Sequence, residues 1–389
     1  MRSTTKRASG SAPRRFGPLM PHIAAALRLA ESAASLTSPN PRVGCVLVGA
    51  DGGVIGQGHT QAAGGPHAEI MALRHAQANG HRTQGATAYV TLEPCAHQGR
   101  TGPCCDALIQ AGVARVVASV QDPNPLVAGL GFARLRAGGV QVEVGAGERE
   151  ARALNIGFFS RMLRQRPWMR LKVAASLDGV TALPNGQSQW ITSPEARADG
   201  HAWRARACAV LTGVGTVLQD RPRLDVRFVP TERQPSLVIV DSALQTPPDA
   251  PLFGVQRPVL IYAAQPHAAR EAALRHAGAQ IVYLPGPPGA DAAPAKVDLR
   301  AMAVDLAARP FNEVHIEAGH QLNGSMIAAG LVDELLVYLA PLWLGQGAGM
   351  SNAGPWTSLS QGLALDFQSV QPIGPDVRIV AQVRGQADF

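Results

Sequence analysis

Three side chains that suit a metal ion, spread over the first third of the chain, constrain the fold more than any other feature. They are His67, Cys95 and Cys104, and Glu69 lies two residues after the histidine. One imidazole and two thiolates form a ligand set for tetrahedral zinc, with the fourth position left for water. The sequence therefore predicts a fold in which three separated segments meet around one ion.

Local patterns place these residues at the ends of predicted strands and the starts of predicted helices. His67 and Glu69 lie at the start of a predicted helix, so both side chains can point into one pocket. A predicted strand leads to Cys95, and Cys104 opens the next predicted helix. Because a helix N-terminus favours anions, a thiolate there is stabilised and binds metal more readily.

The chemistry follows from three ligands and a carboxylate that is not a ligand, a combination typical of zinc-dependent base deaminases. Zinc lowers the pKa of a bound water toward ~7, and the activated water attacks a ring carbon that carries an exocyclic amine. Glu69 is predicted to take the proton from this water and to pass it to the ring nitrogen and to the departing ammonia.

A structural zinc site with four protein ligands is the alternative, and Cys105 would then be the fourth ligand. Adjacent residues on a helix point in different directions, so we expect Cys105 to pack in the core instead of sharing the ion with Cys104. A site closed by four protein ligands would favour a non-enzymatic zinc module.

Strands that alternate with helices predict two α/β domains. The first covers residues 19–146 and the second residues 169–389, with a connector at 147–168 and a basic, disordered tail at 1–18. The first domain is predicted to begin with a helix over residues 19–36, followed by a hairpin. The two hairpin strands are Val43–Val48 and Val54–Gly58. Strands of the second domain are predicted near residues 169–175, 208–213, 236–241, 258–263, 280–284, 312–317 and 333–340.

Charge and composition narrow the class of protein. The net charge is +7, but five basic residues in the first 17 positions, with no acid among them, reduce the rest to +2. The body therefore shows no broad phosphate-binding face, and we expect no nucleic-acid partner. No apolar run is long enough for a membrane span, and no secretory signal follows the basic start. Five scattered cysteines do not form a disulfide framework, so we expect a reducing cytoplasm.

Eight residues separate Cys95 from Cys104, whereas single-domain cytidine and guanine deaminases use a Cys-x-x-Cys spacing. Four stretches of the first domain stand out around these residues: 37–46, 63–69, 91–104 and 121–125. These stretches and the eight-residue spacing closely resemble one family, the bifunctional riboflavin biosynthesis deaminase–reductases. The resemblance covers nearly the whole chain from about residue 20.

The resemblance implies a cytidine-deaminase-like α/β/α fold for the first domain and a diaminopyrimidinone substrate that carries a phosphoribosylamino group. It makes His67, Cys95 and Cys104 the zinc ligands and Glu69 the catalytic proton shuttle. It further assigns substrate binding to Asn40, which on sequence alone is also a turn residue between prolines. The loop residues His97, Arg100 and Thr101 are assigned to the phosphorylated ribose, with a solvated loop charge as the alternative for Arg100. In this loop Ala96 and Gly102 replace residues that are often Ser and Pro in the family.

The second domain lacks a Gly-x-Gly-x-x-Gly motif after a strand, so a Rossmann site is not indicated. Residues 171–179, 188–193, 211–218, 317–325 and 331–335 instead resemble the family's reductase domain. This implies a dihydrofolate-reductase-like α/β fold that uses NADPH to reduce the ribosyl group of the deaminated product, a phosphoribosylaminouracil, to ribityl. In physical terms, small residues at 319–325, between a predicted strand and helix, let backbone N–H groups approach a phosphate, although tight turns also contain glycine.

The resemblance assigns two sets of residues to the reductase site. Those assigned to the dinucleotide are Ala174, Trp190, Thr216, Asp220, Ser242, Gly319, His320, Gln321, Leu322, Asn323, Gly324 and Ser325. Those assigned to the substrate are Lys172, Ser188, Arg204, Leu224, Arg227 and Glu317. Arg204 and Arg227 suit a phosphate clamp, since guanidinium forks match phosphate oxygens, with a surface charge as the alternative. Trp190 has the alternative of a core aromatic.

One departure from the family pattern lies within the reductase set, because residues 220–227 are more basic than that pattern and Asp225 replaces a threonine.

Two further hypotheses compete with the bifunctional enzyme. One is a nucleic-acid base deaminase, which the basic tail favours and the nearly neutral body opposes. The other keeps both folds but has lost one activity. Phosphorylated aminopyrimidines are the expected substrates, and homo-oligomerisation is an expectation from the family.

Overall fold

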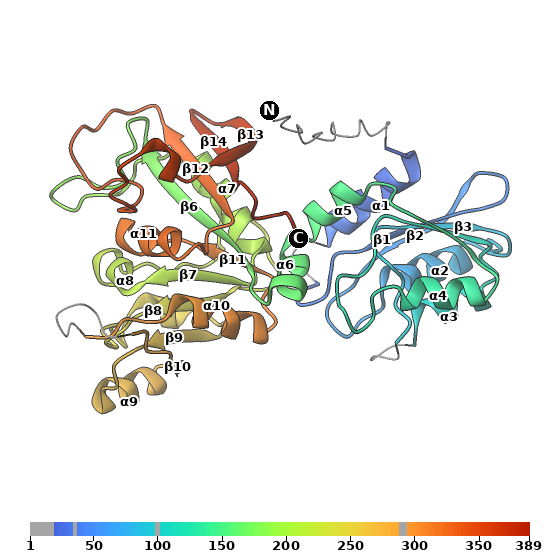
Figure 1. Ribbon diagram of the computed structural model, residues 1–389, viewed down its shortest axis with the longest axis horizontal. Helices are drawn as coiled ribbons and strands as arrows, with labels where there is room; N and C mark the ends of the chain where they lie inside the picture. Colours follow the sequence, from blue (N-terminus) through green and yellow to red (C-terminus); the bar gives the residue numbers. More distant parts are fainter. Residues whose placement is uncertain (1–18, 34–36, 98–101, 288–293) are drawn as a thin grey trace, which may run out of the picture.

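The computed structural model describes residues 19–33, 37–97, 102–287 and 294–389, and it forms two lobes, each built on its own sheet (Figure 1). The smaller lobe holds a five-stranded sheet of order β2-β1-β3-β4-β5. Its strands are β1 Gly44–Val48, β2 Val54–His59, β3 Thr87–Val90, β4 Arg115–Ala118 and β5 Gln141–Val144. The predicted hairpin is confirmed, because β1 and β2 pair antiparallel.

Helices cover both faces of this sheet, which gives the predicted α/β/α arrangement (Figure 1). α1, Pro21–Ser32, packs on one face, with α5, Glu148–Leu154, beside it. The other face carries α2 Ala68–Ala78, α3 Cys104–Gln110 and α4 Leu130–Ala137. β3, β4 and β5 are parallel, so the loops that follow them leave the same edge of the sheet.

Two strand glycines allow α2 to lie unusually close to the sheet. A Cβ at Gly58 in β2 would lie 2.6 Å from the backbone nitrogen of Ala72 and 2.8 Å from the carbonyl oxygen of Ala68. A Cβ at Gly56 would lie 2.3 Å from the carbonyl oxygen of Ala72. Since α2 begins directly after His67 and contains Glu69, these glycines set the position of both side chains.

The larger lobe holds a nine-stranded sheet of order β10-β9-β8-β7-β11-β6-β12-β14-β13. The first seven of these strands run parallel to their neighbours, and the last two are antiparallel. The strands are β6 Trp168–Ser176, β7 Ala209–Gly213, β8 Ser236–Val240, β9 Val259–Ala263, β10 Ala279–Tyr283, β11 Glu313–Ile316, β12 Glu334–Ala340, β13 Leu365–Ile373 and β14 Asp376–Val383. The helices are α7 Pro194–Arg206, α8 Val214–Asp220, α9 Ala268–His276, α10 Leu299–Ala308 and α11 His320–Ala328.

The connector and the last two strands differ from the sequence-based expectation. The predicted connector at 147–168 holds two helices, because Asn155 separates α5 from α6, Ile156–Arg164. The Asn155 side chain accepts a hydrogen bond from the Arg42 N–H and donates one to the Arg42 carbonyl oxygen. The residue between the two helices is therefore bound to the loop that leads into β1. α6 is also not simply polar, because Phe158 and Phe159 are buried. The hairpin of β13 and β14 was not predicted, and its outer strand is largely exposed.

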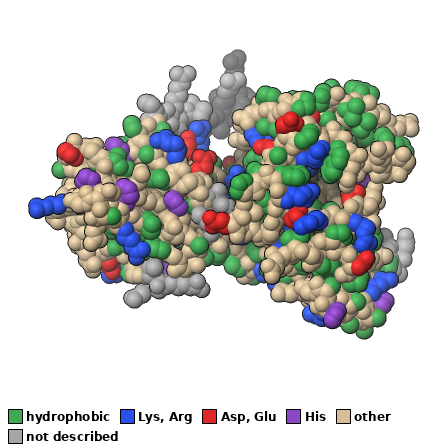
Figure 2. Space-filling view, turned by 180° about the vertical axis from the view of Figure 1, so that it is seen from behind, with side chains coloured by type: hydrophobic (Ala, Val, Ile, Leu, Met, Phe, Trp, Pro, Cys, Tyr) green, Lys and Arg blue, Asp and Glu red, His purple; other side chains and the backbone are tan. Residues whose placement is uncertain are grey.

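The surface and the helix lengths relate to two further predictions, on the distribution of charge and on membrane spans. On the face in Figure 2, Lys and Arg side chains gather in a band over the larger lobe, with acidic side chains between them. Among the described residues, no helix combines the length and the apolar character that crossing a bilayer requires. The basic tail at 1–18 lies outside the described residues.

We expect Gly58→Ala to lower the stability of the smaller lobe by about 1–3 kcal/mol, because its Cβ must push the α2 backbone away from β2. Urea unfolding monitored by circular dichroism measures this change. Gly102→Ala is the control, since its Cβ would meet no atom within 4 Å. Equal midpoints for the two variants would contradict the close packing of α2.

Candidate active sites

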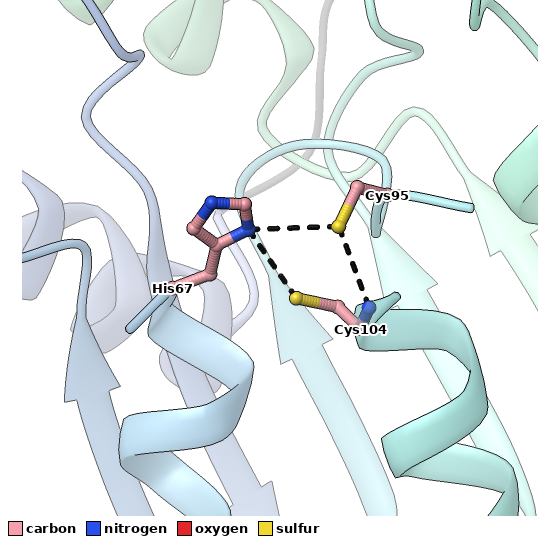
Figure 3. Close-up of side chains that lie close together, drawn as sticks. All are labelled: His67, Cys95 and Cys104. Atoms are coloured by element: carbon pink, nitrogen blue, oxygen red, sulfur yellow. Dashed lines mark hydrogen bonds between the residues drawn. The ribbon is translucent and has the colours of Figure 1, made fainter. Parts of the chain in front are cut away.

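His67, Cys95 and Cys104 come together at one edge of the smaller sheet (Figure 3). Their ligand atoms all lie within 4.8 Å of one another. The imidazole Nδ1 is 3.5 Å from the Cys95 sulfur and 3.4 Å from the Cys104 sulfur. Typical zinc–nitrogen and zinc–sulfur bonds at a tetrahedral angle place such atoms about 3.6 Å apart, so the three side chains fit a zinc ion.

Local structure explains why these side chains converge. His67 is the residue before the first turn of α2, and Cys104 is the first residue of α3. The backbone N–H of Cys104 donates to the Cys95 sulfur at 3.4 Å. Hydrogen bonds from Cys104 and His67 lower the pKa of the Cys95 thiol, which favours the thiolate that binds metal.

Glu69 lies buried in the first turn of α2, close to the three side chains. Burial, and then the charge of Cys95, raises its pKa to about 7. The carboxylate is thus next to the position of the ion, held by a helix and not by a loop.

Glu93 has a structural role that the sequence did not reveal. Its carboxylate accepts hydrogen bonds from the backbone N–H groups of Asp122, Gly129, Gly131 and Phe132, at distances of 2.8–3.2 Å. These bonds tie the segment before Cys95 to the start of α4. The position of a glutamate directly before Pro94-Cys95 was the available signal, and only the structure shows its backbone partners.

Cys105 packs in the core, as predicted. Its side chain is buried, and its thiol donates to the carbonyl oxygens of Pro94 and Gly131 at 3.1 and 3.4 Å. Among the described residues, the group that can hold a metal comprises three side chains and leaves Cys105 out. This arrangement opposes a site closed by four protein ligands.

The structure describes two of the four residues expected to bind the substrate of the first domain, and these two lie in different surroundings. Asn40 lies in the loop that leads into β1 and lines a small crevice between the lobes. His97 is exposed and close enough to Asp122 to lower its pKa, although burial raises that pKa overall to about 6. Arg100 and Thr101 lie outside the described residues.

The larger lobe contains a cleft of about 630 Å³ beside the carboxyl ends of β6, β7 and β11. In open parallel sheets, ligands bind in a crevice at the carboxyl ends of the strands. Most of the residues expected at the reductase site line this cleft. They are Lys172, Ala174, Ser188, Trp190, Arg204, Thr216, Asp220, Leu224, Arg227, Glu317, Gly319, His320 and Asn323.

Five residues expected to bind the dinucleotide are not among the described residues that line the cleft. They are Ser242, Gln321, Leu322, Gly324 and Ser325. The expectation that residues 319–325 precede the helix was wrong, because α11 begins at His320 and Gly319 alone stands before it. Within the helix, Leu322 packs against Gly213 and Gly324 is buried, whereas Gln321 and Ser325 are exposed. The Ser242 hydroxyl accepts a hydrogen bond from the Val297 N–H at 3.2 Å.

Opposite charges neutralise one another along one wall of the cleft. The Arg204 guanidinium pairs with the Glu317 carboxylate through two nitrogens and donates to the Asp225 carbonyl oxygen at 2.9 Å. Lys172 Nζ is 3.9 Å from Glu317, and burial lowers the pKa of this lysine. Although burial raises the pKa of Glu317, Arg204 and Lys172 hold it well below its usual range. Arg204 is thus bound to a protein carboxylate in this structure.

Arg227 is more open than Arg204. Its side chain is 40% exposed, pairs with the Asp225 carboxylate and stacks 4.9 Å from the Phe228 ring centre. Arg223 also pairs with Asp225, at 3.0 Å. The aspartate that replaces threonine here therefore binds the guanidinium groups on both sides of it.

Trp190 is 65% exposed and lines the cleft, with the Arg197 guanidinium 4.4 Å from its ring centre. This opposes the alternative of a core aromatic. An open indole at the edge of a cleft can stack on a planar ring of a ligand.

The folds and the two sites define a class of protein: a deaminase-type zinc-binding domain joined to a reductase domain. Two family models match the chain in agreement with this division. The cytidine and deoxycytidylate deaminase zinc-binding region matches residues 20–120, and the RibD C-terminal domain matches residues 167–379.

Whole-chain relatives narrow the class to one family. The riboflavin biosynthesis protein RibD of Escherichia coli is 43% identical over 369 residues, which cover 92% of this chain and 97% of that protein. A solved structure of RibD from Acinetobacter baumannii is 39% identical, with a TM-score of 0.82 over 93% of this chain and 98% of the other. The deaminase/reductase of Thermotoga maritima, 29% identical, has a TM-score of 0.81 over 93% of this chain and 97% of the other.

The chain belongs to the RibD family of riboflavin biosynthesis proteins. It is a bifunctional enzyme, a deaminase and a reductase, with hydrolase and oxidoreductase activities.

Two neighbouring cysteines provide a sharp test of the zinc site. Cys104→Ala is expected to lose zinc, because its sulfur faces His67 at 3.4 Å, whereas Cys105→Ala is expected to keep a stoichiometric amount. Elemental analysis of the purified variants measures the metal content. Loss of zinc from the Cys105 variant alone would show that the ligand set is wrong.

Proposed function

We propose that the first domain hydrolyses the amine of a diaminopyrimidinone that carries a phosphoribosylamino group, with zinc held by His67, Cys95 and Cys104. The observation that carries the proposal is the convergence of these three ligand atoms within 4.8 Å, with the buried Glu69 close by. When bound, zinc supplies Lewis-acid activation of a water. The Thermotoga maritima relative is described as a diaminohydroxyphosphoribosylaminopyrimidine deaminase and a 5-amino-6-(5-phosphoribosylamino)uracil reductase, which supports the substrate class.

Glu69 moves the protons in this proposal. Its carboxylate takes one proton from the attacking water and gives it to the ring nitrogen. It then takes the remaining proton of the added hydroxyl group and gives it to the departing amine, as the carbon–nitrogen bond breaks and the carbonyl forms. In the net reaction, one water replaces the exocyclic amine, so that the ring gains a carbonyl oxygen and one ammonia is released. The helical position of Glu69 suits this role, because a shuttle must reach both groups without changing its own backbone.

The substrate contacts of the first domain follow the same reasoning. Asn40 hydrogen-bonds the pyrimidine, and His97, Arg100 and Thr101 contact the phosphorylated ribose. The exposure of His97 supports this, since a phosphate must reach it from solvent. We keep Arg100 and Thr101 in the proposal on sequence resemblance alone.

Glu69→Gln tests the proton shuttle. We expect zinc to stay bound and ammonia release to fall by about a hundredfold to ten-thousandfold, the usual contribution of a general acid–base group. An ammonia assay on the diaminopyrimidinone phosphate measures the rate, and Glu31→Gln, an exposed residue of α1, is the control. NADPH oxidation should persist when the deaminated substrate is supplied directly. Ammonia release at the normal rate would remove Glu69 from the mechanism.

For the second domain we propose that the cleft binds NADPH and the deaminated product, and that the ribosyl group is reduced to ribityl. When bound, NADPH supplies the hydride. The residues of this chain bind and orient: Trp190 offers an open ring face, and the N-terminus of α11 at Gly319 offers backbone N–H groups for phosphate. Ser188, Leu224 and Arg227, which also line the cleft, contact the substrate. We keep Arg204, Lys172 and Glu317 as substrate-binding residues, and their mutual pairing orients them.

Gly319→Val tests the cofactor position. The new Cβ would meet only the Thr216 hydroxyl oxygen, at 3.7 Å, so the fold tolerates it, while the branched side chain occupies the cleft. We expect the KM for NADPH to rise about tenfold or more, which corresponds to about 1.4 kcal/mol of lost binding. Gly254→Val, away from the cleft, is the control, and ammonia release should be normal in both. An unchanged KM for NADPH would contradict a cofactor phosphate at α11.

One assay tests the whole proposal: purified enzyme on the diaminopyrimidinone phosphate, with and without NADPH. NADPH oxidation is expected only after deamination, and NADH should serve less well. Homo-oligomerisation, a cytoplasmic location and the absence of a nucleic-acid partner stay predictions from the sequence.

A further inference from the structure

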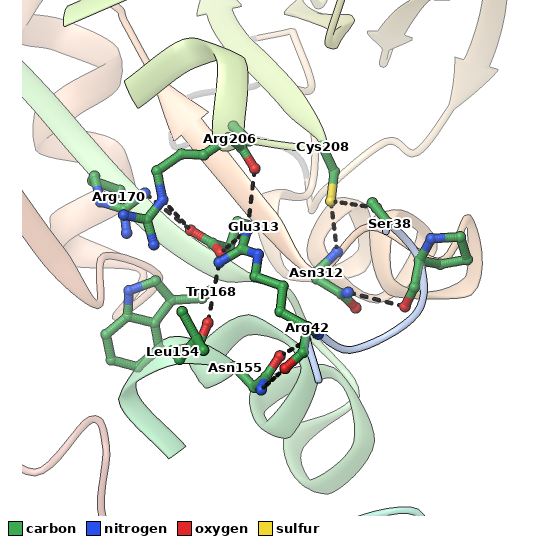
Figure 4. Close-up of polar contacts among 12 residues, drawn as sticks. Ser38, Arg42, Leu154, Asn155, Trp168, Arg170, Arg206, Cys208, Asn312 and Glu313 are labelled. Carbon is green, nitrogen blue, oxygen red and sulfur yellow. Dashed lines mark hydrogen bonds and ion pairs between the residues drawn. The ribbon is translucent and has the colours of Figure 1, made fainter. Parts of the chain in front are cut away.

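We propose that the reductase domain completes the deaminase site, because its residues Asn312 and Cys208 hold the loop that carries Asn40. The inference rests on the proposed substrate-binding role of Asn40. Asn312 and Cys208 would then be positioning residues of the deaminase, although they belong to the other domain (Figure 4).

The first set of contacts fixes the chain just before Asn40. The Asn312 side-chain amide donates to the Pro39 carbonyl oxygen at 3.0 Å, and Arg161 of α6 donates to the same oxygen at 3.2 Å. The Ser38 hydroxyl lies 3.0 Å from the Cys208 sulfur. Since the Pro39 carbonyl and the Asn40 nitrogen share one peptide plane, these bonds fix that plane directly.

A second set fixes the chain just after Asn40, at Arg42. The Arg42 backbone exchanges two hydrogen bonds of 2.8 Å with the Asn155 side chain. The Arg42 guanidinium pairs with Glu313 of β11 at 2.8 Å and donates to the Arg206 carbonyl oxygen at 3.3 Å. Both flanks of Asn40 are therefore attached to residues outside the deaminase domain.

The loop leads to the zinc edge of the smaller sheet. β1 begins at Gly44, whose carbonyl oxygen accepts from the Thr91 N–H, just before the segment that carries Cys95. Burial raises the pKa of the Cys45 thiol in β1, and the nearby charge of Glu69 raises this pKa further. Residues before Gly44 thus leave the sheet at the same edge as the metal ligands.

The Asn40 side chain is half-buried, and it makes no hydrogen bond to any described residue. Its amide is therefore available to a ligand, while its backbone nitrogen is held by the Thr37 carbonyl at 2.7 Å. A fixed backbone with an unpaired amide is what substrate positioning requires, because small errors in placement weaken binding.

The test is Asn312→Asp in the full-length enzyme. This change keeps the oxygen that accepts from Arg161 at 2.6 Å and replaces the donor to Pro39 with an acceptor. We expect the KM for deamination to rise about tenfold while kcat stays within about twofold, because Glu69 and the zinc ligands are untouched. Zinc content and the KM of the reductase should not change.

Two matched variants isolate the effect. Glu334→Gln removes a carboxylate that pairs with Arg170, the same buried arginine that Glu313 contacts. Among the described residues, Glu334 does not contact the loop of Asn40, so the KM of this variant for deamination should be normal. Ser38→Ala removes only the contact with Cys208 and should raise the KM less. It provides a milder second variant if Asn312→Asp folds poorly.

Binding is measured without turnover by calorimetry in the Glu69→Gln background. Asn40→Ala should weaken binding of the diaminopyrimidinone phosphate. Adding Asn312→Asp should weaken binding no further, because Asn312 acts on binding only through the contact that Asn40 makes with the substrate. Additive effects, or normal binding in Asn312→Asp and Ser38→Ala while Asn40→Ala binds weakly, would overturn the inference and leave the role of Asn40 intact. Normal binding by Asn40→Ala would overturn both.

Discussion

The carboxylate of Glu313 is the charge around which the two domains are assembled. It is almost fully buried and faces three guanidinium groups, from Arg42, Arg170 and Arg206. Burial raises its pKa, but these arginines hold it well below the usual range, so the group stays ionised. Separating the domains would remove Arg42 from this buried cluster and expose its charges to rearrangement, so the ion pair favours the joined state.

The strand that begins with this residue also serves the reductase cleft. Glu313 and His315 lie on one face of β11, and Glu317, directly after it, continues that face because side chains alternate along a strand. Glu317 pairs with Arg204 at the cleft, and α7 carries both Arg204 and Arg206. One strand and one helix therefore hold the domain contact at one end and the reductase wall at the other.

Local signals explain what the sequence predicted well. The grouping of His67, Cys95 and Cys104 follows from a helix start, a strand end and a second helix start, each visible within a few residues. The contacts of Glu93 with four backbone amides and of Asn312 with Pro39 join distant segments, so no local pattern reveals them. The boundary at residues 319–325 was misplaced because Gly324, which packs against Asn352, resembles a turn residue although it lies inside α11. The β13–β14 hairpin was missed because β13 is exposed on both faces and lacks an alternating pattern.

The shared charge at Glu313 limits how far this enzyme can be taken apart. A cut between α6 and β6 would leave the carboxylate without Arg42 on one fragment. On the other fragment it would leave Arg42 without its acid, beside a Pro39 carbonyl that keeps Arg161 as a donor but has lost Asn312. Either half would need new surface residues before it could exist as an independent protein. The two domains are thus joined by more than a linker, because they share a buried ion pair and the reductase domain holds a loop of the deaminase domain.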